Sequence, residues 1–367
     1  MIKKSLIIGL LVANIVVASA LLLGKLTTLV SPASFLLPAY FGLIFPFVLT
    51  FNFLFIGFWI LFRKWKFILV SLIPCIICIN NIFNTLPVHI FKTGAPASST
   101  ARLTVMTYNI DSFGQFEFSK KNASAALLEY INKKNPDIVC MQEFYVYNNK
   151  NKEITEQNID KLLQKFPYRH IYYSIVADPF SEGLAIFSKY PIVNKGAIYF
   201  STGYYSSIYA DIEIKSRIIR IFNNHMESNR FSTEERKHYE DLVDGFSAQQ
   251  FHEVLLQFSK KMNEAYAKRS HQADTVSKAI IRSPYPVIAC GDFNDVPVSY
   301  TYTMIKRGMT DTFAAVGNGY GNTFTHKLFP FRIDFIFADK AFVPLHSKVD
   351  RVKHSDHYPV ISQMALE

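Results

Sequence analysis

Polar side chains of the types that bind metal ions or transfer protons flank several short apolar runs in this 367-residue chain. They are Asn109, Glu143, His225, Asp292, Asn294, Asp356 and His357. Side chains at the ends of strands can lie close together at one edge of a sheet although they are far apart in the sequence. Carboxylate and amide oxygens gathered in this way favour Mg²⁺ or Mn²⁺. Such an ion neutralises a phosphate oxygen and activates water, and histidines beside it can transfer protons near neutral pH.

Each of these residues, taken singly, also has a purely structural explanation. A lone Asp or Asn after a strand is typical of a turn, and we interpret Asp295 and Pro297 in that way. We assign no functional role to His170 or His326. The functional interpretation therefore depends on the whole set of residues and not on any one of them.

The elements that must position these residues are short strands and a few helices. The predicted strands are Leu103–Asn109, Asp137–Gln142, His170–Val176, Gly183–Ser188, Ile208–Ile214, Ile218–His225, Val287–Gly291, Asp334–Phe337 and Val360–Met364. A one-sided apolar pattern predicts a helix over Ser124–Asn132. This mixture favours an α/β fold in which two sheets form a sandwich.

The segment Ser232–Arg282 has no strand signal and predicts a helical insert. Its alternating Lys and Glu residues are typical of a solvated helical face. A lid over the site or a contact with a membrane surface is the alternative. The apolar side would then consist of Phe246, Phe251, Leu255, Leu256 and Phe258.

Seven blocks of sequence combine these polar residues with the predicted strands. They are VMTYNID (105–111), DIVCMQEF (137–144), EGLAIFSKYPI (182–192), NNHMES (223–228), ACGDFNDVP (289–297), RIDFIF (332–337) and HSDHYPV (354–360). In type and order they resemble the endonuclease/exonuclease/phosphatase superfamily over residues 102–366. The resemblance implies a deoxyribonuclease-I-like two-sheet α/β sandwich that hydrolyses phosphodiesters with a divalent cation, Mg²⁺ or Mn²⁺.

The resemblance also implies a metal site and a phosphate site. Glu143 resembles the main metal carboxylate with Asn109 beside it, and Asp356 resembles the second metal-side carboxylate. Asp292 is placed among the metal ligands, and with Asn294 it resembles the pair that contacts the scissile phosphate and aligns or deprotonates the attacking water. The implied phosphate-binding set is Asn109, His225, Asn294 and His357.

Two histidine–carboxylate pairs are implied by the same comparison. His357 resembles the general acid/base, and Asp334 resembles the carboxylate that orients it through the other ring nitrogen. His225 resembles a second histidine, found in the deoxyribonuclease branch, with Glu182 as its carboxylate partner. The implied catalytic set is His225, Asp292, Asn294, His357, Asp334 and Glu182.

The sequence departs from the family pattern at two places. Asp111 follows Asn109 by two positions, as in apurinic endonucleases, but the Gly-Leu-Arg that follows there is missing, so Asp111 is a secondary candidate. The Trp-Cys-Asp-Arg signature of inositol-polyphosphate 5-phosphatases is also missing, which disfavours a phosphomonoesterase. We interpret Arg269 and Gln272 as structural residues.

Residues 1–90 are predicted to form a membrane anchor. Three apolar segments, at about residues 5–24, 35–62 and 67–86, reach the roughly 20 residues that a transmembrane helix needs. The second contains Pro38 and Pro46, so we expect it to tilt or kink. A cleavable signal peptide is the alternative for the first segment. Residues 91–101 are then a linker, and residues 102–367 form the catalytic domain.

Basic residues are concentrated in the predicted anchor. Seven of the 39 Lys and Arg residues lie in residues 1–99, which contain no Asp or Glu, so residues 100–367 contain 32 basic and 29 acidic residues. The clusters Lys3–Lys4 and Arg63–Lys66 predict cytoplasmic ends. With three spans, the domain would face the periplasm or exterior from the cell (inner) membrane, whereas two spans would place it in the cytoplasm.

These observations predict a multi-pass membrane protein with a divalent-metal-dependent, nuclease-like phosphodiesterase domain. The alternative within the class is a phospholipid-headgroup (sphingomyelinase-like) phosphodiesterase, because the anchor lies beside lipid and the nearly neutral domain weakens the case for nucleic acid. An inactive membrane scaffold or receptor is the alternative from another class. The expected partners are the lipid bilayer and a phosphodiester substrate, either nucleic acid or a phospholipid headgroup, and no protein partner is evident.

Overall fold

The structure is a computed structural model. It describes residues 4–89, 101–114, 123–149, 152, 154–200, 205–229, 248–326 and 330–367, with the side chains of residues 248–255 left aside. Almost all of the predicted linker, and residues 232–247 of the predicted insert, lie outside the described residues.

The N-terminal region consists of apolar helices. They are α1 (Lys4–Leu26), α2 (Leu37–Leu43), α3 (Phe45–Leu61), α4 (Trp65–Ile77) and α5 (Ile79–Thr85). The helix α1 is long and apolar enough to cross a membrane by itself, whereas α2–α3 and α4–α5 qualify only as pairs bent by 71° and 67°. The bend between α2 and α3 confirms the kink expected in the second apolar segment. The expected number of three spans stays a prediction.

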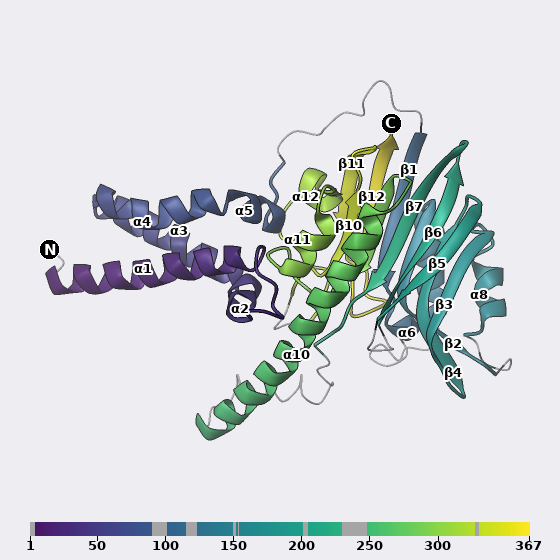
Figure 1. The fold of residues 1–367 in the computed structure, drawn as a ribbon, viewed down its shortest axis with the longest axis horizontal. Helices are drawn as coiled ribbons and strands as arrows, with labels where there is room; N and C mark the ends of the chain where they lie inside the picture. Colours follow the sequence, from purple (N-terminus) through teal and green to yellow (C-terminus); the bar gives the residue numbers. More distant parts are fainter. Residues whose placement is uncertain are drawn as a thin grey trace.

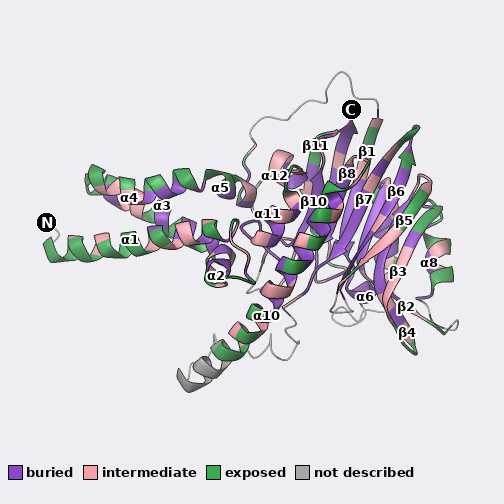
Figure 2. Cartoon of the chain, viewed as in Figure 1, coloured by how far each residue is buried: buried purple, intermediate pink, exposed green. Residues whose placement is uncertain are grey.

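The outer surface of these helices is apolar. Side chains such as Leu6, Val16 and Phe47 are more than half exposed, and Figure 2 shows α1 and α4 with long exposed stretches. Inside the bundle, Asn14 donates to the Ser71 hydroxyl and accepts from the Trp59 indole. Polar contacts inside and apolar side chains outside are typical of helices that pack together in lipid.

Residues from 101 onward form two six-stranded sheets. The first has the order β11 (Phe342–Val349), β12 (Val360–Leu366), β1 (Ala101–Asn109), β2 (Ile138–Tyr147), β4 (Phe180–Ser188) and β3 (Tyr168–Val176). The second has the order β5 (Ile192–Tyr199), β6 (Ser206–Ile214), β7 (Arg217–His225), β8 (Val287–Asp292), β10 (Asp334–Ala338) and β9 (Thr310–Asp311). The pairs β1–β2 and β7–β8 are parallel, and the other pairs are antiparallel.

The two sheets pack face to face over an aliphatic core. Val105 and Ile186 of the first sheet belong to the same buried cluster as Ile208, Ile221 and Ile288 of the second. Helices cover the outer faces: α6 (Asp111–Gly114), α7 (Ala123–Lys134) and α8 (Glu156–Leu162) lie on the first sheet, and α10 (Ala248–Ile281), α11 (Tyr300–Lys306) and α12 (Thr312–Val316) lie on the second. The arrangement confirms the predicted two-sheet α/β sandwich (Figure 1).

Four strands differ from the sequence expectations. The strand that was expected to end at Gln142 continues to Tyr147, so Glu143 lies inside β2 and not after it. The strands β5, β9 and β11 were not predicted, and all three lie at a sheet edge. The strand β9 has only two residues, and edge strands tolerate residues that are rare inside a sheet: β5 includes Lys195 and Gly196, and β11 includes Pro344.

The N-terminal helices pack directly on the sandwich. Ala39 of α2 lies in a buried cluster with Met262 and Tyr266 of α10, and the Tyr40 hydroxyl donates to Asn263 Oδ1 (2.5 Å) and to the Ser259 carbonyl (3.2 Å). The end of α5 is held separately, because its backbone carbonyl at Asn84 accepts from Arg332. The N-terminal helices are therefore joined to the sandwich by side-chain contacts as well as by the chain.

Candidate active site

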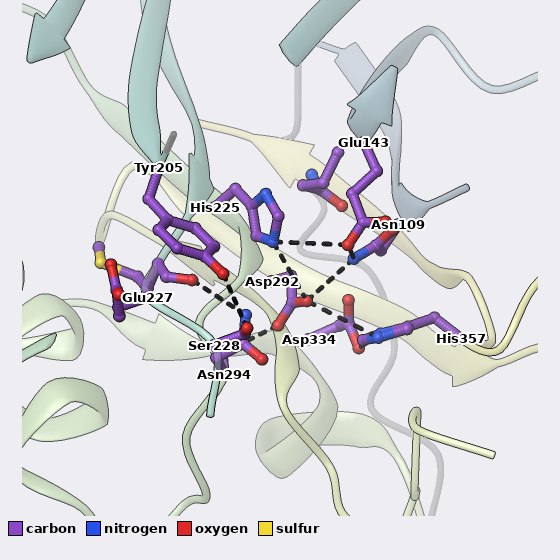
Figure 3. A network of polar contacts seen from close by, with 12 residues as sticks. Asn109, Glu143, Tyr205, His225, Glu227, Ser228, Asp292, Asn294, Asp334 and His357 are labelled. Carbon is purple, nitrogen blue, oxygen red and sulfur yellow. Dashed lines mark hydrogen bonds and ion pairs between the residues drawn. The ribbon is translucent and has the colours of Figure 1, made fainter. Parts of the chain in front are cut away.

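Most of the predicted site residues lie close together, and Figure 3 shows Asn109, Glu143, His225, Asp292, Asn294, Asp334 and His357. Asn109, His225 and Asp292 are the last residues of β1, β7 and β8. Asp334 is the first residue of the antiparallel strand β10, paired with Asp292, and His357 precedes β12. Parallel pairs in the two sheets bring these ends together, as the sequence argument expected.

Asn109 joins the two carboxylates on which the proposed metal site depends. Its side-chain amide donates to Glu143 Oε1 (2.9 Å) and Asp292 Oδ2 (3.0 Å), and its oxygen accepts from the Asp111 backbone N–H (3.1 Å). Glu143 and Asp292 therefore lie on the same side of the molecule. In this arrangement Asn109 orients the carboxylates, and its expected role as a metal ligand stays a prediction.

Glu143 reaches this position through an irregularity in β2. The pairing of β2 with β4 shifts register between Met141 and Phe144, and Glu143 has a φ of 53°, in the left-handed region that is uncommon for residues other than glycine. Such bulges redirect a side chain next to active sites. The backbone distortion thus directs Glu143 toward Asn109 and His225.

Gly291 allows the end of β8 to approach β7 closely, and this approach positions Asp292 in the site. Gly291 has a φ of +138°, and a Cβ atom there would lie 2.0 Å from the Asn224 carbonyl oxygen on β7. Beyond the strand, Asp292 Oδ1 accepts from the Asn294 backbone N–H (2.8 Å). The Asn294 side chain donates to the Met226 carbonyl (3.0 Å), so Asp292 and Asn294 are fixed as a unit.

His357 is held between two aspartates. Its Nδ1 lies 2.9 Å from Asp334 Oδ2, and its Nε2 lies 3.7 Å from Asp292 Oδ2. Asp356 Oδ1 lies 4.0 Å from the same Nε2, and the Ser355 hydroxyl accepts from the His357 backbone N–H (3.1 Å). The structure therefore joins His357 and Asp334 as expected, with Nε2 directed at the carboxylates.

His225 faces the same carboxylates from the end of β7, where it is paired with Asp292 on β8. Its Nε2 lies 3.7 Å from Glu143 Oε1 and 4.0 Å from Asp292 Oδ2, and its ring packs edge-on against Tyr205 at 5.0 Å. Glu182 lies on β4 opposite Tyr145. Its expected pairing with His225 stays a prediction.

Burial and mutual repulsion shift the pKa values of these groups. Removal from water, followed by the charge of Asp356, raises the pKa of Glu143 to about 8. Burial, followed by the charge of Asp334, raises the pKa of Asp292 to about 7. Burial, followed by the charge of His357, lowers the pKa of His225 to about 3. Burial would also lower the pKa of His357, but Asp334, Asp292 and Asp356 raise it well above its usual value.

Two family models match the chain, one over the sandwich and one over the N-terminal helices. Residues 106–357 match the model of the Endonuclease/Exonuclease/phosphatase family. The chain belongs to this family. Residues 4–85 match a domain of unknown function (DUF8431), and no curated protein matches the chain.

The chain is also similar to several solved structures, one of which has a TM-score above 0.5 and shares the fold. The human Nocturnin catalytic domain, solved with a bound sulfate anion, is 17% identical with a TM-score of 0.51, covering 74% of this chain and 95% of that one. A Beutenbergia cavernae endonuclease/exonuclease/phosphatase is 18% identical with a TM-score of 0.48, covering 72% of both chains. Caenorhabditis elegans TDP2 is 19% identical with a TM-score of 0.48, covering 73% of this chain and 98% of that one.

The side chains of this family member fit a divalent cation. Asp292, Asp334 and His357 offer ligand atoms that all lie within 4.8 Å of one another, although the hydrogen bond to His357 occupies Asp334 Oδ2. Burial raises the pKa values of Glu143 and Asp292, and the neighbouring carboxylates Asp356 and Asp334 raise them further. A cation held by oxygen atoms of Glu143, Asp292 and Asp356 would offset this concentration of negative charge.

Several residues around the site were not assigned a role in it from the sequence. Arg269 donates to the Glu227 carbonyl (2.8 Å) and Asn229 Oδ1 (2.9 Å), and it lies 3.6 Å from Asp295 Oδ2. Asp295 was expected to be a turn residue, but it is also buried and accepts from the Thr301 hydroxyl. This network supports the wall of the pocket above Asp292, as does Gln272, which accepts from the Glu227 backbone N–H. The structural interpretation of Arg269 and Gln272 agrees with these contacts.

Tyr205 and Ser228 also border the site, although neither was assigned a role from the sequence. The Tyr205 hydroxyl and the Ser228 hydroxyl lie 2.7 Å apart, and Ser228 lines the pocket. Ser228 ends the block NNHMES (223–228) but has no side chain typical of a metal ligand. Tyr205 lies outside the seven blocks, so only its contact with His225 indicates a role. The secondary candidate Asp111 is buried beside Asn109 and adds negative charge near Glu143.

Proposed function

We propose that the chain is a membrane-tethered, divalent-cation-dependent phosphodiester hydrolase. The observation that carries the proposal is the position of Asp292 Oδ2, which lies 4.0 Å from His225 Nε2 and 3.7 Å from His357 Nε2. In this arrangement the carboxylate of Asp292 can act as the base, and the protonated ring of His357 can act as the acid. Membership of the endonuclease/exonuclease/phosphatase family supports the same reaction class.

The contacts and pKa values of these groups assign a task to each. Asp292 lies between the two histidines and accepts the proton of the attacking water, which Asn294 helps to align. His357 carries a proton at neutral pH, because Asp334 holds its Nδ1, and Nε2 gives that proton to the leaving oxygen. His225 stays neutral, because its pKa is lowered to about 3, and its ring donates to a phosphate oxygen.

A bound Mg²⁺ or Mn²⁺ would neutralise charge on the phosphate and acidify the attacking water. Glu143, Asp292 and Asp356 are the side chains that would hold it. Asn109 keeps Glu143 and Asp292 in place through its two amide hydrogen bonds.

The proposal includes the location of the domain. The apolar helix α1 supports membrane attachment, and the basic clusters Lys3–Lys4 and Arg63–Lys66 support cytoplasmic ends with the domain on the periplasmic or outer side. An alkaline phosphatase fused after Glu367 is expected to be active in cells. An inactive fusion, with a cytoplasmic reporter active instead, would place the domain in the cytoplasm.

Hydrolysis of bis-p-nitrophenyl phosphate by the full chain in detergent tests the activity. We expect turnover that requires Mg²⁺ or Mn²⁺ and is lost with EDTA, and a fall of about 100-fold or more for Asp292→Asn and for His357→Gln. His271→Gln, at an exposed position on α10, is the matched control and should retain wild-type activity. Absence of turnover with this compound, nucleic acids and phospholipids would favour the inactive scaffold or receptor.

A further inference from the structure

The pocket that contains the site has a polar floor and an apolar wall. The floor consists of Glu143, Asp292, Asn294, Asp356 and His357. The wall includes Leu43, Phe258, Met262, Tyr266, Phe324 and Phe331. A phosphodiester needs the floor alone for its chemistry, so the wall indicates an apolar group attached to the substrate.

Part of this wall belongs to the apolar N-terminal helices. Leu43 is the last residue of α2 and packs with Phe258 against the cluster of Ala39, Met262 and Tyr266. Figure 1 shows α2 beside α10 at the end of the helical bundle nearest the sandwich. The catalytic pocket and the anchor therefore share a surface.

The shared surface is held in place by close contacts. A Cβ atom on Gly42 would lie 2.3 Å from the Val298 carbonyl oxygen, so α2 lies directly against the loop that follows β8. On α5, the backbone carbonyl of Asn84 accepts a hydrogen bond from Arg332, and the side-chain oxygen of Asn84 accepts one from Lys306. Contacts at both α2 and α5 fix the direction in which the pocket opens relative to the helices.

The orientation of the pocket relative to a membrane follows from the angle of 71° between α2 and α3. When α3 crosses a bilayer, a helix at this angle lies near the membrane surface, and Leu43 is then at the level of the lipid headgroups. The rim of the pocket is thus apolar on the side that the anchor brings to lipid.

The charges in the pocket do not suit a polyanion. Arg269 is the one Lys or Arg side chain among the described residues that line it, and it is buried and bonded to Glu227 and Asn229. A nucleic-acid strand needs several cations that follow its phosphates. A single phosphodiester next to an apolar group needs none beyond the site itself.

We propose that the substrate is the phosphodiester of a membrane phospholipid, with its phosphate on the polar floor and its apolar part against Leu43, Phe258 and Met262. This inference rests on the proposed hydrolase function. The oxygen of water bonds to phosphorus, one P–O ester bond breaks, and the released alcohol takes the proton. The products are an alcohol and a phosphomonoester, one of which keeps the acyl chains.

The test compares substrates on the full chain reconstituted in vesicles of phosphatidylcholine, phosphatidylethanolamine and phosphatidylglycerol. Lipid products are measured by mass spectrometry, and bis-p-nitrophenyl phosphate, 20-nucleotide DNA and RNA are assayed in parallel. We expect turnover of at least one phospholipid at a kcat/KM at least 10-fold above those for DNA and RNA. Faster cleavage of DNA or RNA would overturn the inference and leave the hydrolase function intact.

Matched variants test the apolar wall. Leu43→Gln and Phe258→Gln are expected to lower the ratio of phospholipid turnover to bis-p-nitrophenyl phosphate turnover at least 10-fold. Ile281→Gln, at an exposed apolar position on the same helix as Phe258, should leave the ratio unchanged. An unchanged ratio in the wall variants would overturn the inference, and loss of metal-dependent turnover of every substrate by the wild type would overturn the hydrolase function as well.

Discussion

At the scale of single residues, the site brings several carboxyl groups close together in a buried position. Glu143 and Asp292 are packed beside Asp356 and Asp334, and burial removes the water that would screen them. Raised pKa values in a cleft are typical of functional sites. The same repulsion links the stability of the fold to pH and to cation binding.

Metal-free protein should therefore lose stability as pH rises. The pKa of Glu143 is about 8 in the fold and near 4.5 in the unfolded chain, so the fold favours the protonated form, and this contribution disappears between about pH 4.5 and pH 8. In EDTA, we expect the Tm to fall from pH 5 to pH 9, and Glu143→Gln to reduce that fall by more than about 2 °C.

The control for this prediction is Glu264→Gln, at an exposed position of α10, which should follow the wild type. Added Mg²⁺ should raise the Tm of the wild type at pH 8 and have less effect on Glu143→Gln. Parallel Tm curves for all three proteins in EDTA would contradict the assigned burial of the Glu143 charge.

At the scale of elements, strand ends and one glycine position the site. Gly291 combines a φ of +138° with an approach to Asn224 that leaves no room for a Cβ atom. Gly291→Ala should therefore lower the Tm by about 6 °C or more, which corresponds to roughly 3 kcal/mol. Gly308→Ala, at a φ of +78° with nothing within 4 Å, should cost only about 1 kcal/mol.

Thermal melting of both variants in detergent separates backbone strain from steric overlap. Equal losses of Tm would show that β7 and β8 do not approach each other as closely as described. A larger loss for Gly291→Ala, together with loss of phosphodiesterase activity, would show that the end of β8 sets the position of Asp292.

The sequence predicted most of these elements, and the misses have physical causes. The block GDFND marks the end of β8, because the apolar residues Val287–Cys290 lead directly to Gly291 and Asp292. The bulge at Glu143 was missed, because apolar residues typical of a strand lie on both sides of it, Met141 before it and Phe144 and Val146 after it. A single residue with a positive φ changes the direction of its side chain, and this backbone conformation leaves no trace in the local composition.

At the scale of the whole molecule, the sequence could predict an anchor and a domain but not how they pack. Leu43 and Met262 are more than 200 positions apart, and each is apolar in a segment where apolar residues are expected. No spacing rule connects them, so only the fold shows that both line the same pocket.

The packing of α2 should be sensitive to volume at Gly42. A Cβ atom there would meet the Val298 carbonyl at 2.3 Å and Thr27 Cγ2 at 2.7 Å. Gly42→Val is expected to separate α2 from the sandwich and to increase hydrogen exchange in residues 258–266 of α10. Gly57→Val, where nothing lies within 4 Å, should leave that exchange unchanged, and equal exchange in both variants would argue against the α2–α10 contact.

The order of strands in the first sheet has a consequence for biosynthesis. The strand β1 lies between β2 and β12, and β12 also pairs with β11. The strand β12 is synthesised long after β1, so the nascent chain cannot complete this sheet until residues 360–366 have left the ribosome. His357, just ahead of β12, can contact Asp334 only after that segment has been made, so this histidine–carboxylate pair forms late in folding.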